Sequence, residues 1–575
     1  MNNQSINNDD FDGLSFEEQC KIVFSAPLER RGELVVRSHS PEELTGAFSA
    51  EEMYLMVREM DSSNVPELIR SANFQQLEFM ADFECWQSSE IKAEGFLRWL
   101  QYLAEAGNDR FELWLLHADL ELIIAGLQKV MNVLKPFHEE TIDDIVGDKP
   151  YFTLDGLYYI MIESDNLTIL KRALSILFDH AKPCYYAVLE GILSESETIV
   201  EEDAYLHRMV RLGEKGFPEK EFAFSIYNYL TEDEWGKLSY KNSAQVSNIQ
   251  GEVNLPSYPT FWQQKKMFID DVFALLVRDN RQIQSDIYQE FVWLCNKVMV
   301  CKEIDSFSKE HARSAYEHVR SVLSVGFEKL SGGDPEKAHC FLCERWLEYI
   351  FRYGFSLLVD LRTEIESYIR VKWSFSKEFL NEFFGETYGA VLNGILREVP
   401  QFYDARQCLG LDMLRDFNSI RDVEETSNKL NAIKSVLNII DSKFLSLNQT
   451  IDLNGKQAEK SLPVFKQFFI TMFANFVISG ELSIEPVESY DANMFLMDVF
   501  AASRMAGEKP HIDEKIRADY LIAFFNKFFD LSDDDISSLE SLFDECFKLA
   551  EEELGYIDPR RAIDADFIES LLIKK

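Results

Sequence analysis

Three consecutive segments near the start of the chain repeat one helix-starting pattern, and this repeat constrains the fold more than any other feature. They begin at Ser15, Ser40 and Asn64, and in each a Glu follows within three residues. A short polar side chain at this position accepts a hydrogen bond from an unpaired backbone N–H, and the acid favours the positive end of the helix. The pattern therefore predicts helix starts that recur every 24 to 25 residues.

A second capping residue lies inside each segment, nine or ten residues after the first. These residues are Ser25, Ser49 and Asn73. Each segment is therefore predicted to form a short helix, a tight joint and a longer helix. Because one such pair cannot bury its own apolar face, we expect successive pairs to stack into a superhelical array.

The rest of the chain is also predicted to be helical, so the fold class is predominantly all-α. Only 15 Pro and 25 Gly occur among 575 residues, which favours long helices over turn-rich β-structure. Residues 108–134 are expected to form a helix with a wide apolar face. The exception is 151–162, where β-forming residues surround the turn pair Asp155–Gly156 and predict one small β-hairpin.

Polar stretches and breaks in the helical periodicity divide the chain into predicted segments. We expect a disordered tail over 1–14, the helical-repeat domain over 15–135, the β-hairpin with further helices over 136–238, a linker over 239–260, a long-helix domain over 261–447, a second linker over 448–462 and a C-terminal helical domain over 463–575. The linkers are predicted where large apolar side chains are scarce and Ser, Asn and Gly are frequent.

The charge of the chain excludes one class of function. Lys and Arg total 58 and Asp and Glu total 99, which gives a net charge of −41. Such a field repels phosphate backbones, so no sequence-independent binding of nucleic acid is expected.

The cysteines and the hydropathy pattern together favour a cytoplasmic protein. The nine cysteines are an odd number scattered over a long chain, which is typical of reduced thiols. The first residues lack the basic and apolar regions of a signal peptide. No uncharged apolar run approaches the roughly 18 residues of a membrane-spanning helix, so we expect no membrane insertion. A bacterial cytoplasm is the expected compartment.

Two resemblances add to this interpretation. The helix starts SPEEL, SAEEM and VPELI make residues 15–87 resemble the superhelical N-terminal domain of bacterial magnesium transporters. That resemblance implies a cation role for Glu42, Glu43, Glu51 and Glu52, whose alternative role is to favour the positive ends of their helices. The whole chain is similar to an uncharacterised family of long, acidic, helical bacterial proteins, in the stretches LDGLYYI, RLGEKGFP and LEYIFRYGFSLL.

The stretch HCFLCERWLEYIFRYGFSLL, which begins at His339, raises the question of a metal or redox site. His339, Cys340 and Cys343 are the candidate ligands. Asp334 and Pro335 predict a helix start just before them. If the whole stretch forms one continuous helix, both cysteines lie on the same apolar stripe as Leu347 and Ile350. This position favours buried structural thiols. Metal binding and redox chemistry remain alternatives, although the sequence names no segment that would complete a set of four zinc ligands.

The sequence carries none of the strong catalytic or nucleotide-binding motifs, so no catalytic residue and no cofactor is predicted. The expected function is that of a non-catalytic interaction, adaptor or regulatory protein with a protein partner that binds its helical-repeat surface. An enzyme with a site between helical subdomains and a regulator that responds to divalent cations are the alternatives. The sequence does not indicate an oligomeric state.

Overall fold

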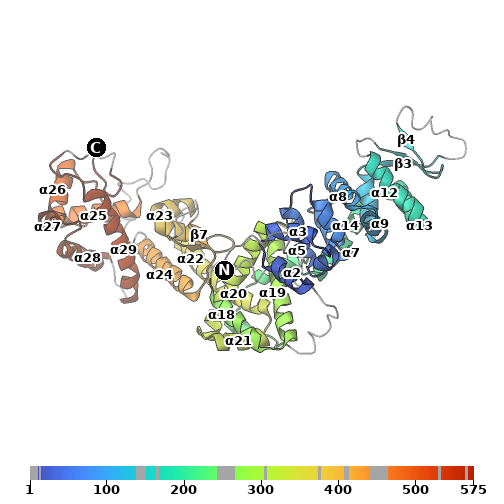
Figure 1. Cartoon of the computed structure of the whole chain (residues 1–575). Coiled ribbons are helices and arrows are strands. Elements are labelled where there is room, and N and C mark those ends of the chain that lie inside the picture. Colours follow the sequence, from blue (N-terminus) through green and yellow to red (C-terminus); the bar gives the residue numbers. More distant parts are fainter. Residues whose placement is uncertain are drawn as a thin grey trace. The chain divides into compact units, whose positions relative to one another are not determined.

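The computed structural model describes residues 14–136, 150–162, 167–241, 266–302, 307–372, 377–406, 413–439, 464–528, 533–561 and 568–574, together with Phe11 and Ile563. These residues form two compact units, Met1–Tyr353 and Gly354–Lys575 (Figure 1). Most of the predicted tail over 1–14, most of the predicted linker over 239–260 and the whole of that over 448–462 lie outside the described residues. Both units are built mainly from helices, which confirms the predicted fold class.

The first unit begins with the predicted helix pairs. Their helices are α2 (Phe16–Ser25), α3 (Leu28–Arg37), α4 (Pro41–Gly46), α5 (Ala50–Glu59), α6 (Val65–Ser71) and α7 (Phe74–Glu84). Ser49 caps α5 by accepting a hydrogen bond from the Glu52 N–H at 3.2 Å, and Asn73 caps α7 through the Gln76 N–H at 2.9 Å. The first pair differs, because Ser25 ends α2 and Pro27 precedes α3.

The pairs stack as expected, and a buried ion pair lies inside the stack. Helix α5 packs between α3 and α7. Arg31 on α3 lies 3.5 Å from Glu52 on α5, and both side chains are buried. Burial lowers the pKa of Arg31 to about 10, although Glu52 acts in the opposite direction. Arg31 also donates to the carbonyl oxygen of Ala26 at 2.9 Å, which joins α3 to the end of α2.

The remainder of the first unit mixes helices with short strands. Its next elements are β1 (Trp86–Gln87), β2 (Glu90–Ile91), α8 (Ala93–Ala106), α9 (Asn108–His117), α10 (Leu120–Gln128), β3 (Asn132–Leu134), β4 (Tyr151–Phe152), β5 (Tyr159–Met161), α12 (Leu167–His180), α13 (Lys182–Ser194), α14 (Glu197–Glu214), α15 (Lys220–Phe224), the 3₁₀ turn η1 (Ser225–Tyr227) and α16 (Glu232–Lys237).

The predicted hairpin over 151–162 is present and is part of a larger sheet. Strands β4 and β5 pair antiparallel, and the Asp155 carboxylate accepts hydrogen bonds from Leu157 and Tyr158 in the turn. Strand β3 pairs with the other edge of β5, so the order is β3-β5-β4. The single helix predicted over 108–134 is therefore wrong, since this stretch holds two helices and β3. Two further antiparallel strand pairs were not predicted, β1–β2 here and β6 (Phe402–Tyr403) with β7 (Leu414–Arg415) in the second unit.

The first unit ends in long helices around α20. They are α18 (Phe268–Ala274), the turn η3 (Leu275–Arg278), α19 (Arg281–Cys301), α20 (Lys309–Ser331), α21 (Pro335–Glu344) and α22 (Leu347–Lys372), and the boundary with the second unit falls inside α22. Helix α20 packs against α18, α19 and α21. Phe307, just before α20, contacts Tyr54, Phe83 and Phe217, so one aromatic cluster joins the long helices to the N-terminal pairs.

The second unit packs around the phenylalanine-rich helix α25. Its elements are α23 (Lys377–Ile395), β6 (Phe402–Tyr403), β7 (Leu414–Arg415), α24 (Ile420–Ile439), α25 (Phe465–Ser479), α26 (Ser489–Val499), α27 (Ala501–Ala506), α28 (Glu514–Phe528) and α29 (Asp533–Leu554). Phe469 stacks on Phe543 with ring centroids 4.4 Å apart, and Tyr520 donates to the Phe469 carbonyl at 3.0 Å. The chain end adds one parallel bridge between Val487 and Ile573.

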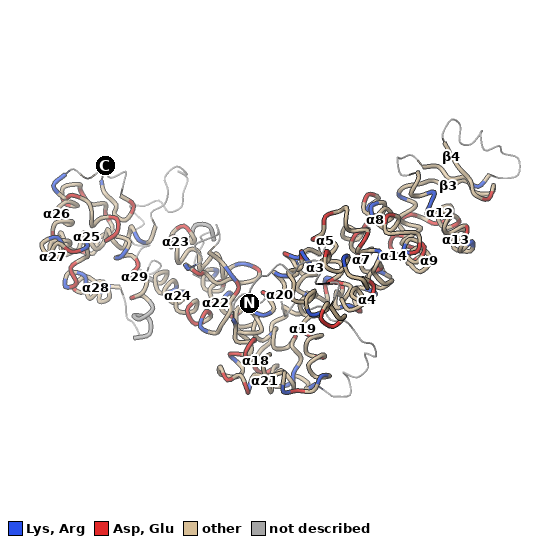
Figure 2. Tube along the Cα trace, viewed as in Figure 1, with Lys and Arg blue, Asp and Glu red and all other residues tan. Residues whose placement is uncertain are grey.

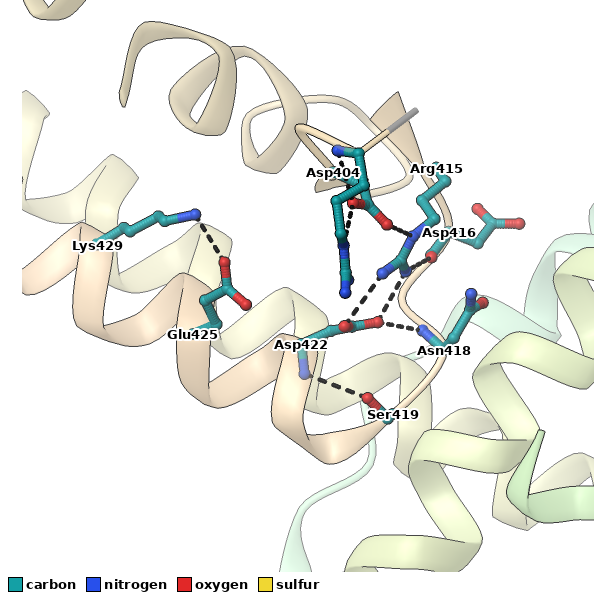
Figure 3. A network of polar contacts seen from close by, with 9 residues as sticks. Asp404, Arg415, Asp416, Asn418, Ser419, Asp422, Glu425 and Lys429 are labelled. Carbon is teal, nitrogen blue, oxygen red and sulfur yellow. Dashed lines mark hydrogen bonds and ion pairs between the residues drawn. The ribbon is translucent and has the colours of Figure 1, made fainter. Parts of the chain in front are cut away.

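A network of ion pairs fixes the β6–β7 hairpin to α24 (Figure 3). Arg415 donates to Asp404 at 2.8 Å and, through both terminal nitrogens, to Asp422 in the first turn of α24. Burial by itself would raise the pKa of Asp404, but hydrogen bonds from Arg415 and Arg406 outweigh it and lower this pKa to about 2.

In the part of the chain that the structure describes, no helix is both long enough and apolar enough to span a lipid bilayer.

Candidate functional site

The helix that carries the His-Cys-x-x-Cys stretch begins as predicted and ends early. The Asp334 carboxylate accepts a hydrogen bond from the Glu336 N–H at 3.0 Å and Pro335 opens α21. The helix stops at Glu344, Arg345 is extended, and α22 starts afresh at Leu347. The single continuous helix predicted here is wrong. The predicted burial of both thiols is wrong as well, because Cys340 is exposed and Cys343 is only half-buried.

Side chains from distant segments account for this break. The buried Arg345 guanidinium lies over the rings of Tyr240 and Trp235, and it donates to the carbonyl oxygen of Leu238. The Glu290 carboxylate on α19 accepts from the Leu347 N–H at 3.0 Å, which places a negative charge at the start of α22. These contacts favour an extended Arg345 over a further turn of helix.

The break leaves His339 and Cys343 on α21 facing a third polar group. Nε2 of His339 lies 2.7 Å from Oδ2 of Asp279 and 3.8 Å from Sγ of Cys343. Asp279 belongs to the joint between η3 and α19, and the neighbouring pair Arg278–Glu336 ties the same joint to α21. All three ligand atoms lie within 4.8 Å of one another. The cluster thus contains two of the three predicted candidates and excludes Cys340.

The electrostatics of this cluster hold the thiol in its protonated form. Burial raises the pKa of Cys343 to about 11, and the nearby negative charge of Asp279 adds to the effect while Lys241 opposes it. A thiol in that state does not act as a nucleophile at neutral pH, so redox chemistry is disfavoured. Deprotonation at neutral pH would require a cation beside Sγ.

A second cluster of possible metal ligands consists of Asp119, Glu121 and His207, and an arginine already pairs with it. Asp119 and Glu121 lie 3.2 Å and 3.6 Å from Nδ1 of His207. Arg211 donates to Asp119 at 3.0 Å and pairs with the buried Asp82 through two nitrogens. The hydrogen bond that His207 donates to the Asp119 carboxylate raises the pKa of His207. Because a cation already neutralises these acids, we interpret the cluster as a link between α7, α10 and α14.

The four glutamates implied by the transporter resemblance do not converge. Glu42 is exposed and pairs with Arg110 at 2.5 Å, and Glu43 is exposed. Glu51 is buried, and burial raises its pKa in spite of an opposing effect of Lys215. Glu52 faces Arg31 inside the stack. Among the described residues these carboxylates form no joint ligand set, so the cation role stays a prediction without a site.

A pocket of about 450 Å³ lies near the break between α21 and α22. Its walls include Trp293, Trp346 and Tyr349. Two charged residues of the lining, Lys297 and Glu348, pair with each other at 2.5 Å. The third charged residue of the lining, Glu290, pairs with Lys241 at 2.7 Å, so all three charges have partners and aromatic rings form part of the wall.

The second unit has an exposed apolar face that the sequence analysis did not identify. Tyr490, Met494 and Met497 recur at i, i+4 and i+7 on α26 and therefore share one side, and Met505 lies on the adjoining α27. They are 74%, 45%, 44% and 89% exposed, respectively. This methionine face was missed because the same spacing is usual for a buried helix stripe.

Three acidic residues lie close to the methionine face in the chain. Glu488 and Asp498 are exposed and Asp491 is half-buried, all on or beside α26. Lys574 pairs with Glu488 at 2.8 Å, and its pKa is raised by that contact. Arg504 on α27 donates to the carbonyl oxygen of Leu496 at 3.2 Å. The face therefore combines polarizable, adaptable side chains with a negative border.

Comparisons with known proteins give one finding. A family model matches residues 8–574, and its description is Family of unknown function (DUF6178). No curated protein and no solved structure matches the chain. The match agrees with the expected resemblance to an uncharacterised family, whereas the resemblance to magnesium transporters is not confirmed.

Proposed function

Because the chain belongs to the DUF6178 family, whose function is unknown, we propose its function from its own surface: it is a non-catalytic interaction protein. Its methionine face on α26 and α27 binds a basic amphipathic helix of a partner protein. The observation that carries this proposal is the exposure of Tyr490, Met494, Met497 and Met505 together.

The chemistry of the face supports this choice of partner. Methionine side chains are flexible and polarizable, so a surface rich in them adapts to the apolar residues of different helices. Such a helix lays residues at i, i+3, i+4 and i+7 into an apolar surface. The acids Glu488, Asp491 and Asp498 at the border attract Lys and Arg on the flanks of that helix and repel an acidic one.

A cytoplasmic location belongs to the same proposal. The eight described cysteines are free, including the buried Cys85, Cys295 and Cys546. Free thiols are usual where thioredoxin and glutathione keep cysteines reduced.

A designed peptide tests the proposal. The probe is a helical peptide with Leu on one face and Lys on the other, labelled for fluorescence anisotropy and titrated with the full chain. A peptide of the same composition in scrambled order is the reference. We expect the amphipathic peptide to bind, and we expect Met494→Glu combined with Met497→Glu to weaken binding about tenfold or more, since central apolar contacts dominate such interfaces.

The matched control carries the same change on another exposed apolar stripe. Leu206 and Val210 on α14 are exposed, and Leu206→Glu with Val210→Glu adds the same charge. This variant is expected to bind like the wild type. If it loses binding while the α26 variant keeps it, or if the scrambled peptide binds as well as the amphipathic one, the proposal is wrong.

A further inference from the structure

The cluster of Asp279, His339 and Cys343 has the donor atoms of a transition-metal site. His339 and Cys343 are four residues apart on α21, so their side chains are neighbours on one helix face. Asp279 reaches the same point from the joint before α19, sixty residues earlier in the chain. The three side chains are neither fully exposed nor sealed from solvent, which leaves a path for an ion.

The distances suit a tetrahedral ion after a small adjustment. With Zn–N and Zn–O bonds of about 2.1 Å and a Zn–S bond of about 2.3 Å, neighbouring ligand atoms lie roughly 3.5 Å apart. The distance between His339 Nε2 and Cys343 Sγ is 3.8 Å, close to that value. The distance between His339 Nε2 and Asp279 Oδ2 is 2.7 Å, that of a hydrogen bond, and would widen as the ion replaced the shared proton.

The geometry points to a zinc site at Asp279, His339 and Cys343, with a water molecule as the fourth ligand. Three protein ligands and one open position are typical of zinc that is not fully enclosed by protein. The combination of sulfur, imidazole nitrogen and carboxylate oxygen suits Zn²⁺, whereas Mg²⁺ and Ca²⁺ select oxygen ligands. On binding, Cys343 releases its thiol proton to solvent, and the neutral imidazole of His339 binds the ion through Nε2 while its one proton lies on Nδ1.

The site has a structural consequence. Asp279 precedes α19 and the other two ligands lie on α21, so the ion cross-links two segments that both contact the core of the first unit. Metal binding therefore stabilises the folded first unit, in proportion to the logarithm of the ratio of free zinc to its dissociation constant.

Cobalt substitution in the full-length protein tests this site. Co²⁺ replaces Zn²⁺ in tetrahedral sites and gives a sulfur-to-metal charge-transfer band when a thiolate is a ligand. We expect metal-free wild type to bind one equivalent of Co²⁺ with this band, and one equivalent of Zn²⁺ to abolish it. Cys343→Ser removes the band, and His339→Gln weakens Co²⁺ binding about tenfold or more, as does Asp279→Asn, on the scale of zinc-ligand contributions.

The neighbouring thiol supplies the matched control. Cys340→Ser removes an exposed sulfur from the same helix without touching the cluster and is expected to keep the band. The assignment is wrong if the band is lost in Cys340→Ser and kept in Cys343→Ser. It is also wrong if the wild-type protein shows no band in excess Co²⁺. Circular dichroism establishes that each variant is folded. A zinc-dependent rise in the melting temperature of the wild type, absent in His339→Gln, is the independent readout.

Discussion

Single polar residues with distant partners decide much of the local structure. Asp404 receives hydrogen bonds from Arg415 and Arg406, and Arg415 also holds Asp422 at the start of α24. The Asp404 carboxylate accepts hydrogen bonds through both oxygens only in its ionised form, because the protonated form carries a hydrogen on one of them. The stability of the β6–β7 hairpin therefore depends on the protonation of one side chain.

Replacing Asp404 by Asn is expected to destabilise the second unit by about 1.5 to 3 kcal/mol at neutral pH, the usual contribution of hydrogen bonds to a charged group. The folded pKa of Asp404 is about 2 and the unfolded value is about 3.9. Because the folded pKa is the lower one, the contribution is complete above about pH 5 and is lost as the pH falls from about 4 towards 2. Urea unfolding at several pH values, followed by hydrogen exchange of the hairpin amides, measures it.

The control lies on α24, the helix whose first turn contains Asp422. Glu425 forms an exposed i,i+4 pair with Lys429, so Glu425→Gln is expected to change stability by no more than about 0.5 kcal/mol. Equal stability of Asp404→Asn and wild type at neutral pH would contradict the expectation, as would a difference that does not shrink in acid.

At this scale, several capping residues are predictable and distant pairs are not. The predicted caps Ser40 and Asn64 precede their helices, but their side chains accept no capping hydrogen bond. Ser49, Asn73 and Asp334 bond to N–H groups two or three residues away, so the sequence contains the whole interaction. Asp279 and His339 are sixty residues apart, and nothing in either segment names the other. His339 and Cys343 could be proposed as a partial ligand set, and only the fold supplies the third ligand.

Helices are well predicted as elements, and their ends are less so. Apolar periodicity and caps locate α5, α7 and α21, but the break before Leu347 follows from Glu290 and Arg345, whose partners come from other elements. The helix predicted over 108–134 fails for a similar reason. Asp119, at its break, faces His207 and Arg211 on α14 rather than continuing the helix.

Close contact between elements gives a prediction at Gly95 in the first turn of α8. A Cβ added there would lie 2.3 Å from the carbonyl oxygen of Glu84 at the end of α7. Since backbone atoms cannot rotate away as a side chain does, Gly95→Ala is expected to cost about 1 to 3 kcal/mol. Thermal unfolding of the full chain, read at the transition of the first unit, measures the loss.

Gly46 on α4 provides the comparison, because a Cβ there meets nothing within 4 Å. Gly46→Ala is expected to be neutral or to stabilise by up to about 1 kcal/mol through helix propensity. A Gly95→Ala variant as stable as Gly46→Ala would show that α7 and α8 are not this close.

Over the whole molecule, the helical content can be predicted from the sequence, but the boundary between the two units cannot. Helical content follows from the scarcity of Pro and Gly and from the repeat. The boundary between the units lies at Tyr353–Gly354, inside α22, where the sequence is that of an uninterrupted helix. No polar stretch rich in Ser, Asn and Gly marks this boundary, so a prediction based on linker composition does not find it.

The net charge of −41 gives a prediction for partner binding. Figure 2 shows acidic residues spread over both units. Their negative electric field therefore attracts a basic peptide before the peptide touches the protein. The association rate of the basic helical peptide is expected to fall about tenfold or more with added salt, as the Debye length drops from about 30 Å at 0.01 M to about 3 Å at 1 M. The dissociation rate, governed by the methionine contacts, is expected to change little.

Stopped-flow anisotropy separates the two rates. An otherwise identical peptide with Gln in place of Lys is the control and is expected to associate slowly at every salt concentration. A dissociation rate that carries most of the salt effect would contradict this account.

The exposure of Cys340 has a practical consequence. Of the described cysteines it is the exposed one, while burial raises the pKa of Cys85, Cys295, Cys301 and Cys546 and so slows their alkylation. A maleimide fluorophore would therefore attach first to Cys340, which follows His339 on α21, the helix that ends at the joint containing Arg345. The residue that helical geometry appeared to bury becomes a built-in attachment point for a dye beside that joint.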